Sequence, residues 1–235
     1  MTATAPAPRT AVVLVAAGSG TRVGAGTNKV LLPLLGRPVL GWTLATVCSL
    51  EYVDHVVVVA RREDAESVAG LVRAQLGPDR QATLVVGGAT RHESEWRGLS
   101  ALRGAVDAGG VEVVAVHDAA RPLADAALFE LVVRAARQHG GALPVRPQPA
   151  LVTTDGRRRV PGLVGVQTPQ AFRAAPLLEA YARAHADGLV GTDTASCVAA
   201  YTDLAVHAVR GPATNLKITF PEDIDLAERL LLHGR

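Results

Sequence analysis

The sequence contains few cysteines, few aromatic residues and no long apolar run. Its two cysteines, Cys48 and Cys197, lie far apart in a chain of 235 residues and show neither a metal-binding nor a redox spacing. They therefore imply no disulfide framework, and we expect both to be small buried hydrophobic residues. No apolar stretch approaches the length of a membrane-spanning helix. The formal net charge of +2 is too small to indicate a nucleic-acid or membrane partner.

The amino-terminal segment also lacks a targeting signal. Its first ten residues, MTATAPAPRT, have no apolar core of the kind that a signal peptide carries. We expect residues 1–10 to be a disordered lead-in, and a cytoplasmic location follows by default. Residues 11–235 are numerous enough to bury a real core and are rich in alanine, valine and leucine. We expect them to form one domain.

Lysine is nearly absent from the chain. The 24 basic residues include only two lysines, Lys29 and Lys217, and the others are arginines. A bias that replaces lysine wherever arginine will serve leaves lysine at positions that need a compact ammonium, for example between phosphate oxygens. Chance survival on the surface is the alternative, and composition alone does not decide between the two.

Apolar strands and amphipathic helices alternate along the chain. The predicted strands cover residues 11–16, 55–60, 82–86, 111–116, 142–145 and 204–209. The predicted helices cover residues 39–50, 62–76, 91–106, 124–139, 174–185 and 221–232. Short continuous apolar runs separated by helices predict a single-domain α/β fold with a mainly parallel, doubly wound sheet. In such sheets ligands bind at the carboxyl ends of the strands.

Residues 146–167 break this alternation. They contain several prolines, the turn Thr154-Asp155-Gly156 and the arginine run 157–159. This composition predicts a projecting β-arm over about residues 146–165 rather than a helix. Arms of this kind often serve oligomerisation or cover an active site.

A glycine-rich turn follows the first predicted strand. In the stretch AAGSGTR, residues 16–22, Gly18 and Gly20 allow backbone amides to converge on an anion, and Arg22 and Lys29 add positive charge. No Gly-Lys-Ser/Thr closes the loop, and the dinucleotide-binding glycine pattern is absent too. A purely structural turn is the alternative.

Other chemistry-bearing stretches also follow strands. In HDAARP, Asp118 and Arg121 suit a site for hydroxyls, phosphates or a metal, with an internal salt bridge as the alternative, whereas we expect His117 to be a packed structural histidine. After Gly87-Gly88, free amides and Ser94 lie where a base or ribose could be recognised, with a plain helix cap as the alternative.

The order and spacing of these stretches resemble the cytidylyltransferases that act on phosphorylated polyols, above all the 2-C-methyl-D-erythritol 4-phosphate cytidylyltransferase family. The matching pieces are AAGSGTR with Lys29, GGATRHES, VHDAARP, QTPQAF, GTDTAS and NLKITFPEDIDLAE. They extend from about residue 11 to residue 232. The resemblance implies a nucleotidyltransferase-type, Rossmann-like fold and an enzyme that transfers CMP from CTP to a phosphorylated polyol, with Mg²⁺ bridging the triphosphate.

The resemblance also implies roles for individual residues. Those that neutralise the reacting phosphates match Arg22, Lys29 and Lys217, so both rare lysines fall on catalytic positions of the family. The implied nucleotide-binding residues are Ala16, Ala17, Gly18, Ser19, Gly20, Gly88, Ala89 and Ser94. The residues implied to face the acceptor are Asp118, Arg121 and Thr168. The sequence assigns no metal ligand.

The arm departs from the family pattern. In the family it reaches across a homodimer and supplies a threonine and an arginine to the substrate of the neighbouring subunit. Here the usual Asp-Thr pair aligns with Ala150-Leu151 and the usual arginine falls near Val160, although Thr153, Thr154 or the arginines at 157–159 could substitute. Milder departures are Asn28, where proline is common, and Thr194, where an acid is common.

These departures leave the acceptor open. Methylerythritol phosphate is the leading acceptor, and a homodimer is expected. The alternatives are another phosphopolyol or a phosphonate of wall-polymer or secondary metabolism, and a non-catalytic nucleotide-binding relative. The three retained cations argue against the last alternative, because a mere binder has little need for charges around the α-phosphate.

Overall fold

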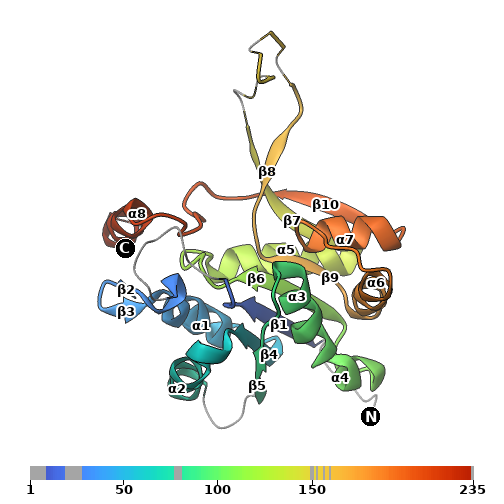
Figure 1. Cartoon of the computed structure of the whole chain (residues 1–235), viewed down its shortest axis with the longest axis horizontal. Helices are drawn as coiled ribbons and strands as arrows, with labels where there is room; N and C mark the ends of the chain where they lie inside the picture. The colour runs from blue at the N-terminus through green and yellow to red at the C-terminus, as the bar shows by residue number, and fades with distance from the viewer. Residues whose placement is uncertain are drawn as a thin grey trace, which may run out of the picture.

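The computed structural model describes residues 9–18, 28–76, 81–148, 151, 153–155, 157–158 and 160–233 (Figure 1). An eight-stranded sheet runs through these residues in the order β10-β7-β9-β6-β1-β4-β5, with β8 paired to β7. The strands are β1 (Thr10–Val15), β4 (Val53–Ala60), β5 (Gln81–Val86), β6 (Val113–Asp118), β7 (Gly140–Pro147), β8 (Val164–Val166), β9 (Gln170–Arg173) and β10 (Ala205–Arg210). A small separate hairpin joins β2 (Pro33–Leu34) to β3 (Arg37–Pro38).

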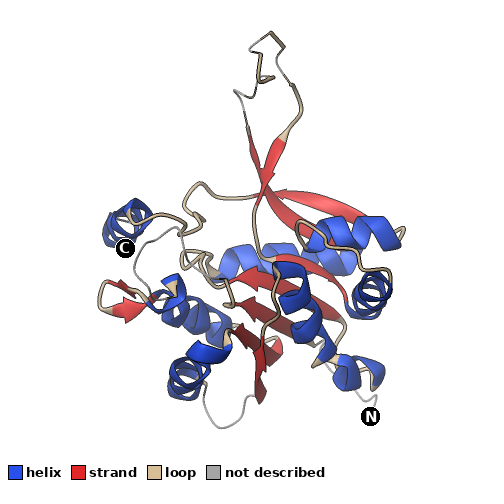
Figure 2. Cartoon of the chain, viewed as in Figure 1, coloured by secondary structure: helices blue, strands red, loops and turns tan. Residues whose placement is uncertain are grey.

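Helices pack on both faces of this sheet (Figure 2). These helices are α1 (Val39–Ser49), α2 (Ala65–Gln75), α3 (Arg91–Ser100), α4 (Arg103–Asp107), α5 (Ala126–His139), α6 (Ala174–Ala186) and α7 (Thr194–Tyr201), with single 3-10 turns η2 (Lys29–Leu31) and η3 (Arg62–Asp64). Helix α8 (Glu222–His233) packs instead against Leu34 of β2. None of the described helices is long and apolar enough to cross a membrane.

Strand β1 shows why the sheet needs two helical layers. Its side chains alternate between the faces, as the geometry of a strand requires. Val12 and Leu14 pack into the cluster that α1, α2 and α5 cover, whereas Ala11 and Val13 pack into the cluster of α3, α4, α6 and α7. A strand that is buried on both faces reads as a continuous apolar run, which is why the sequence predicts it.

The predicted fold class is confirmed. Strands β6, β1, β4 and β5 are parallel, and so are β7 and β10, whereas β9 runs antiparallel between these two groups. The last residues of β7 pair antiparallel with β8, and Figure 1 shows β8 above the rest of the sheet.

Several predicted elements need correction. The helix expected over residues 91–106 is two helices, because the amide of Leu102 bonds to the carbonyl of Leu99 in a tight turn that ends α3. Strand β1 begins at the fully buried Thr10, inside the expected lead-in. Strand β9, the β2–β3 hairpin and helix α7 were not predicted, because short elements carry little periodicity of their own.

The register of the parallel strands brings their carboxyl ends to one edge. Val15 lies opposite both Val59 of β4 and Asp118 of β6, and Ala60 lies opposite Val86 of β5. The chain passes outward from β1 through β4 to β5 and then returns to place β6 on the other side of β1. The carboxyl ends of β1 and β6 therefore form a topological switch point, where a crevice opens in folds of this kind.

Candidate active site

A pocket of about 320 Å³ opens at this switch point. It is bordered by the ends of β1 and β6, the start of α3, the turn η2 and the segment before α8. Its lining residues are Val15, Ala17, Gly18, Lys29, Val30, Gly88, Ala89, Thr90, Arg91, Ser94, Asp118, Ala120, Lys217 and Thr219. Segments from both ends of the chain thus meet in one cavity.

Most of the described residues predicted for the site lie in this wall. Those brought together are Ala17, Gly18, Lys29, Gly88, Ala89, Ser94, Asp118 and Lys217. Ala16, Arg121 and Thr168 are not part of the wall. Ala16 is buried at the end of β1, and the other two lie beside or behind Asp118. The predicted Ser19, Gly20 and Arg22 lie outside the described residues.

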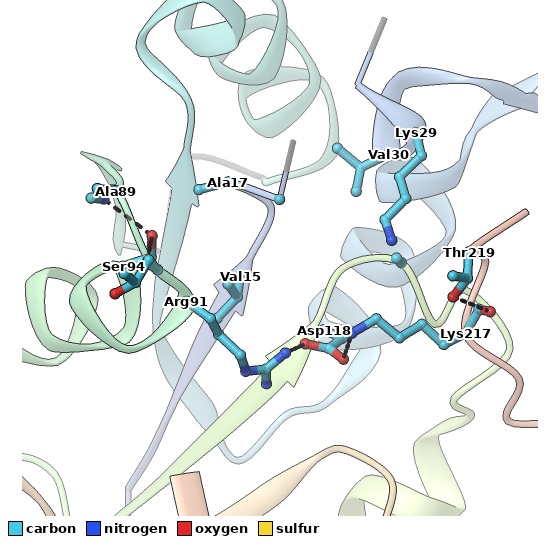
Figure 3. A pocket seen from close by; sticks show the side chains of 14 residues that line it. Val15, Ala17, Lys29, Val30, Ala89, Arg91, Ser94, Asp118, Lys217 and Thr219 are labelled. Carbon is cyan, nitrogen blue, oxygen red and sulfur yellow. Dashed lines mark hydrogen bonds and ion pairs between the residues drawn. The ribbon is translucent and has the colours of Figure 1, made fainter. Parts of the chain in front are cut away.

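Charged side chains converge at the centre of the pocket. Arg91 and Lys217 approach the carboxylate of Asp118 from opposite sides, and the side chain of Lys29 points toward this group (Figure 3). Lys217 Nζ lies 2.8 Å from Asp118 Oδ2, while Arg91 Nη1 donates to Asp118 Oδ1. Among the described lining residues, three cations therefore face one carboxylate, which leaves an excess of positive charge suited to an anion.

The ionisation of Asp118 follows from these neighbours. Burial alone would raise the pKa of this carboxyl, but the charges of Arg91 and Lys217 outweigh burial and hold the pKa well below its usual range. Arg121 lies 3.8 Å away and acts in the same direction. Asp118 is therefore charged at neutral pH.

Lys29 is positioned by the residue before it. The side-chain amide of Asn28, fully buried, donates to the carbonyl of Ala16 at 2.9 Å and to Asp64 Oδ2 at 2.8 Å. Asp64 in turn pairs with Arg61. Asn28, where the family commonly has proline, thus ties Lys29 by hydrogen bonds to the end of β1 and to the turn η3.

Lys217 is positioned by the segment in which it lies. The amide of Ile218 bonds to the carbonyl of Ala120 at 2.8 Å, just past the end of β6. The Arg121 guanidinium donates to the carbonyl of Asn215 at 2.7 Å, and the Asn215 side chain donates to the carbonyl of Thr168 at 2.9 Å. Arg121 and Thr168 therefore fasten the lysine-bearing segment to the sheet.

The turn between β5 and α3 forms a helix cap, and the amides expected to be free are used within it, since Ala89 N also donates to Glu93 Oε2 at 2.7 Å. Thr90 caps the helix, because its side chain accepts from the amide of Glu93 at 3.0 Å. Ser94 Oγ accepts from the amide of Gly88 at 3.1 Å. A Cβ at Gly88 would lie 2.2 Å from Glu93 Cδ, so a larger residue there would require the Glu93 side chain to move.

His117 lies behind Asp118 and is fully buried. Its Nδ1 is 3.0 Å from Thr168 Oγ1, which already accepts from the amide of Asp118, and its Nε2 is 3.3 Å from the carbonyl of Arg121. Burial lowers the pKa of His117 to about 3, so the ring is neutral at physiological pH. Its surroundings fit the packed role expected from the sequence.

Two charged residues were not assigned a role from the sequence. Arg91 lies in the pocket, and Glu95, one helical turn later on α3, is 1% exposed. Burial and the charge of Asp118 raise the pKa of Glu95 above its usual value, although Arg91 and Tyr181 act in the opposite direction. The spacing of four residues was the available signal, since such residues share one side of a helix. This spacing could not reveal the neighbours that make the pair part of the site, Asp118 on β6 and Tyr181 on α6.

The described residues of the pocket include few side chains that could bind a metal ion. No group of three or more His, Cys, Asp and Glu side chains suited to a metal occurs in the described part of the chain. Among the described lining residues, Asp118 alone carries a carboxylate. Because Mg²⁺ is usually held by one or two carboxylates together with substrate phosphates, Asp118 fits an ion that the triphosphate itself holds in the main.

Together, the fold and the pocket define a class. A doubly wound sheet with a cationic crevice at the carboxyl ends of its strands is typical of nucleotide-binding α/β proteins. The family model for 2-C-methyl-D-erythritol 4-phosphate cytidylyltransferase matches residues 10–233. The chain belongs to this family, as its motifs indicated.

Individual relatives agree with this assignment. A protein of that name from Thermosynechococcus vestitus is 38% identical over 231 residues, covering 95% of this chain and 96% of its own. Another, from Symbiobacterium thermophilum, is 40% identical and covers 94% and 92%. The crystal structure of the Thermus thermophilus protein of the same name superposes with a TM-score of 0.70 at 35% identity, covering 93% of this chain and 97% of that one.

Proposed function

We propose that this protein is an enzyme that transfers CMP from CTP to 2-C-methyl-D-erythritol 4-phosphate and releases pyrophosphate, a step of isoprenoid precursor synthesis by the non-mevalonate route. The observation that carries the proposal is the convergence of Lys29, Arg91 and Lys217 on one pocket at the switch point of the sheet. Family membership over residues 10–233 supports the choice of reaction and substrate.

The proposed reaction needs no protein nucleophile. A phosphomonoester is largely dianionic near neutral pH, since its second pKa is about 6. One of its oxygens attacks the α-phosphorus of CTP, a new P–O bond forms, and the bond from the α-phosphorus to the bridging oxygen breaks. Pyrophosphate leaves with that electron pair. The barrier comes from repulsion between anions and from charge that builds up on the phosphates.

The positively charged side chains of the pocket would lower this barrier. Lys29 and Lys217 would offset charge on the reacting phosphates, and Arg22 of the glycine-rich loop is proposed to act with them. Asp118 keeps the Lys217 ammonium in place through the 2.8 Å ion pair. Gly88, Ala89 and Ser94, which line the pocket, would lie near the cytosine and ribose. Mg²⁺, if held by the triphosphate and Asp118, supplies further charge neutralisation.

The arm bears on the identity of the acceptor. Leu151 and Val160 lie opposite each other, because the amide of Val160 donates to the carbonyl of Leu151 at 3.1 Å. Both side chains are exposed, and neither can donate a hydrogen bond to a phosphate or neutralise it. This observation favours a second candidate function, cytidylyl transfer to a different phosphopolyol or to a phosphonate.

The first test is pyrophosphate release with CTP and Mg²⁺ in the presence of single acceptors. We expect turnover with methylerythritol phosphate and much less with ribitol 5-phosphate, glycerol 3-phosphate or hydroxyethylphosphonate. Turnover confined to one of the other acceptors would reject the proposed substrate and retain cytidylyl transfer. Measurable CTP binding without turnover on any acceptor would support a non-catalytic relative instead.

A homodimer is part of the same proposal. Val164 and Val166 of β8 are 48% and 46% exposed and lie two residues apart, hence on the same face of the strand. An exposed apolar strand face outside the core is typical of a surface that pairs with another chain. We propose that a second copy of this chain covers it.

Replacing both Val164 and Val166 with aspartate should dissociate the dimer into single chains. We expect a wild-type molar mass near twice the 24.4 kDa of one chain, measured by light scattering after gel filtration, and the single-chain mass for Val164→Asp/Val166→Asp. The matched control is Val206→Asp, at a valine of the edge strand β10 that is 36% exposed. A wild-type protein that stays monomeric at assay concentrations would contradict this proposal.

A further inference from the structure

Glu95 lies beneath the pocket, between helices α3, α6 and α7. Its carboxylate receives three donors from three helices. Oε1 accepts from Arg91 Nε at 2.9 Å and from Thr194 Oγ1 at 3.2 Å, and Oε2 accepts from the hydroxyl of Tyr181. A carboxylate that is 1% exposed is costly unless such partners satisfy it. The full set of partners makes it a rigid anchor.

The anchor is connected to the reacting centre through one guanidinium. Arg91 uses Nε for Glu95 and Nη1 for Asp118. Asp118 then binds Lys217 Nζ at 2.8 Å. The charges therefore alternate from the core to the pocket in the order Glu95, Arg91, Asp118, Lys217. Because a guanidinium is planar, binding at one edge restricts where its other nitrogens can point.

Without the Glu95 carboxylate, the Arg91 guanidinium would be held by the Asp118 carboxylate and no longer by a second one. The Arg91 side chain would then be free to turn toward bound phosphates or to draw Asp118 away from Lys217. We propose that Glu95 is a positioning residue for cytidylyl transfer, which orients Arg91 and thereby sets the placement of Asp118 and Lys217. The inference rests on the proposed function for its kinetic readout.

A role that is only structural would produce a different result. Glu95 also links α3 to α6 and α7, so its loss lowers stability under either interpretation. Turnover and CTP affinity in folded protein separate the two. A replacement carboxylate can also be introduced at position 194 on α7, because Thr194 Oγ1 lies 3.2 Å from Glu95 Oε1. Position 194 is also where the family resemblance leads one to expect an acid.

The experiment compares wild type, Glu95→Gln, Thr194→Glu and the double variant Glu95→Gln/Thr194→Glu in the full chain. Glu179→Gln, at an exposed glutamate of α6, is the matched control. We expect Glu95→Gln to lower kcat about 100-fold, as small misplacements of reacting groups do. CTP affinity, measured by calorimetry, should weaken about tenfold because a charge-assisted contact is lost. The double variant should regain most of the lost kcat.

Each outcome bears on one claim. Folded Glu95→Gln with wild-type kcat and wild-type CTP affinity would overturn the inference, and so would a double variant that regains stability but no kcat. A wild type without turnover would reject the proposed function, and weaker CTP binding in Glu95→Gln would then still support the inference. If Glu95→Gln does not fold, Glu95→Asp, which keeps the charge and shortens the side chain, must show the loss of kcat instead.

Discussion

Replacing Lys29 or Lys217 with alanine is expected to lower kcat for pyrophosphate release by about 100- to 1,000-fold or more, the range seen when one preorganised charge-stabilising group is removed. Lys29 lines the pocket with a side chain that is largely buried, and Lys217 reaches it from the segment before α8. Both ammonium groups act on charge that grows during the transfer. Binding of CTP in the ground state should suffer less than turnover.

The fold should survive both changes. In Lys217→Ala, Asp118 keeps Arg91 and Arg121 as partners, so no carboxylate is left buried alone. Circular dichroism and urea denaturation would check this point. Arg134→Ala, on the exposed face of α5, controls for the loss of one positive charge.

Arginine at the same positions is the sharper comparison. The chain uses arginine for every other basic residue, so Lys29→Arg and Lys217→Arg test whether a compact ammonium is required. We expect both to keep the charge yet remain well below wild-type kcat, because a broad planar guanidinium does not fit where an ammonium lies between phosphate oxygens. Near-normal turnover in either alanine variant would count heavily against the mechanism.

Asp118→Asn is expected to lower the free energy of unfolding by about 3–5 kcal/mol, since removing one partner of a buried ion pair leaves the other charges uncompensated. Arg91, Lys217 and Arg121 all face this carboxylate, and its side chain is 7% exposed. Asparagine keeps the shape and removes the charge. Turnover should fall as well, because Lys217 loses the contact that positions it.

The control for this change is an exposed pair. Asp54 lies 3.5 Å from Arg9, and their side chains are 40% and 56% exposed. Asp54→Asn should therefore change stability by no more than about 1 kcal/mol. Urea denaturation measures both variants, and an Asp118→Asn protein as stable as wild type would show that the three cations do not depend on this carboxylate.

The pH dependence has a defined sign. The pKa of Asp118 is lowered by folding, so its contribution is fully present above the ordinary value of 3.8 and is lost as the pH falls below it. The advantage of wild type over Asp118→Asn should thus be constant near neutral pH and shrink below about pH 4. Bound CTP should also stabilise Asp118→Asn, because its phosphates replace the missing negative charge.

Much of the fold could be predicted from apolar runs. Strands β1, β4 and β6 are buried on both faces and read as short apolar segments, so their existence and parallel arrangement followed from local pattern. Strand β9 was missed because four residues carry too little periodicity, and its antiparallel pairing with β6 depends on a segment far away in the sequence. Helix α7 was missed because its eight residues span only about two helical turns and show little periodicity.

Some residues of the site could likewise be predicted from the sequence, and others could not. Residues directly after strands, such as Gly18, Gly88 and Asp118, could be assigned to one edge because parallel strands end together. Glu93 and Glu95 stand two residues apart in the sequence, yet Glu93 is at the surface with Arg97 and Glu95 is in the core with Tyr181. Only the packing of α6 and α7 against α3 distinguishes them.

By itself, the sequence determined most of the strands and helices and their order along the chain, the residue types at the strand ends and the two positions where lysine is retained. These properties are local, because periodicity, turn geometry and residue type depend on a few neighbouring positions. The tertiary structure alone decided that Lys29 and Lys217 share a pocket and that Arg91 and Lys217 meet at Asp118. These contacts join segments remote in the chain, and their geometry depends on strand register and helix packing.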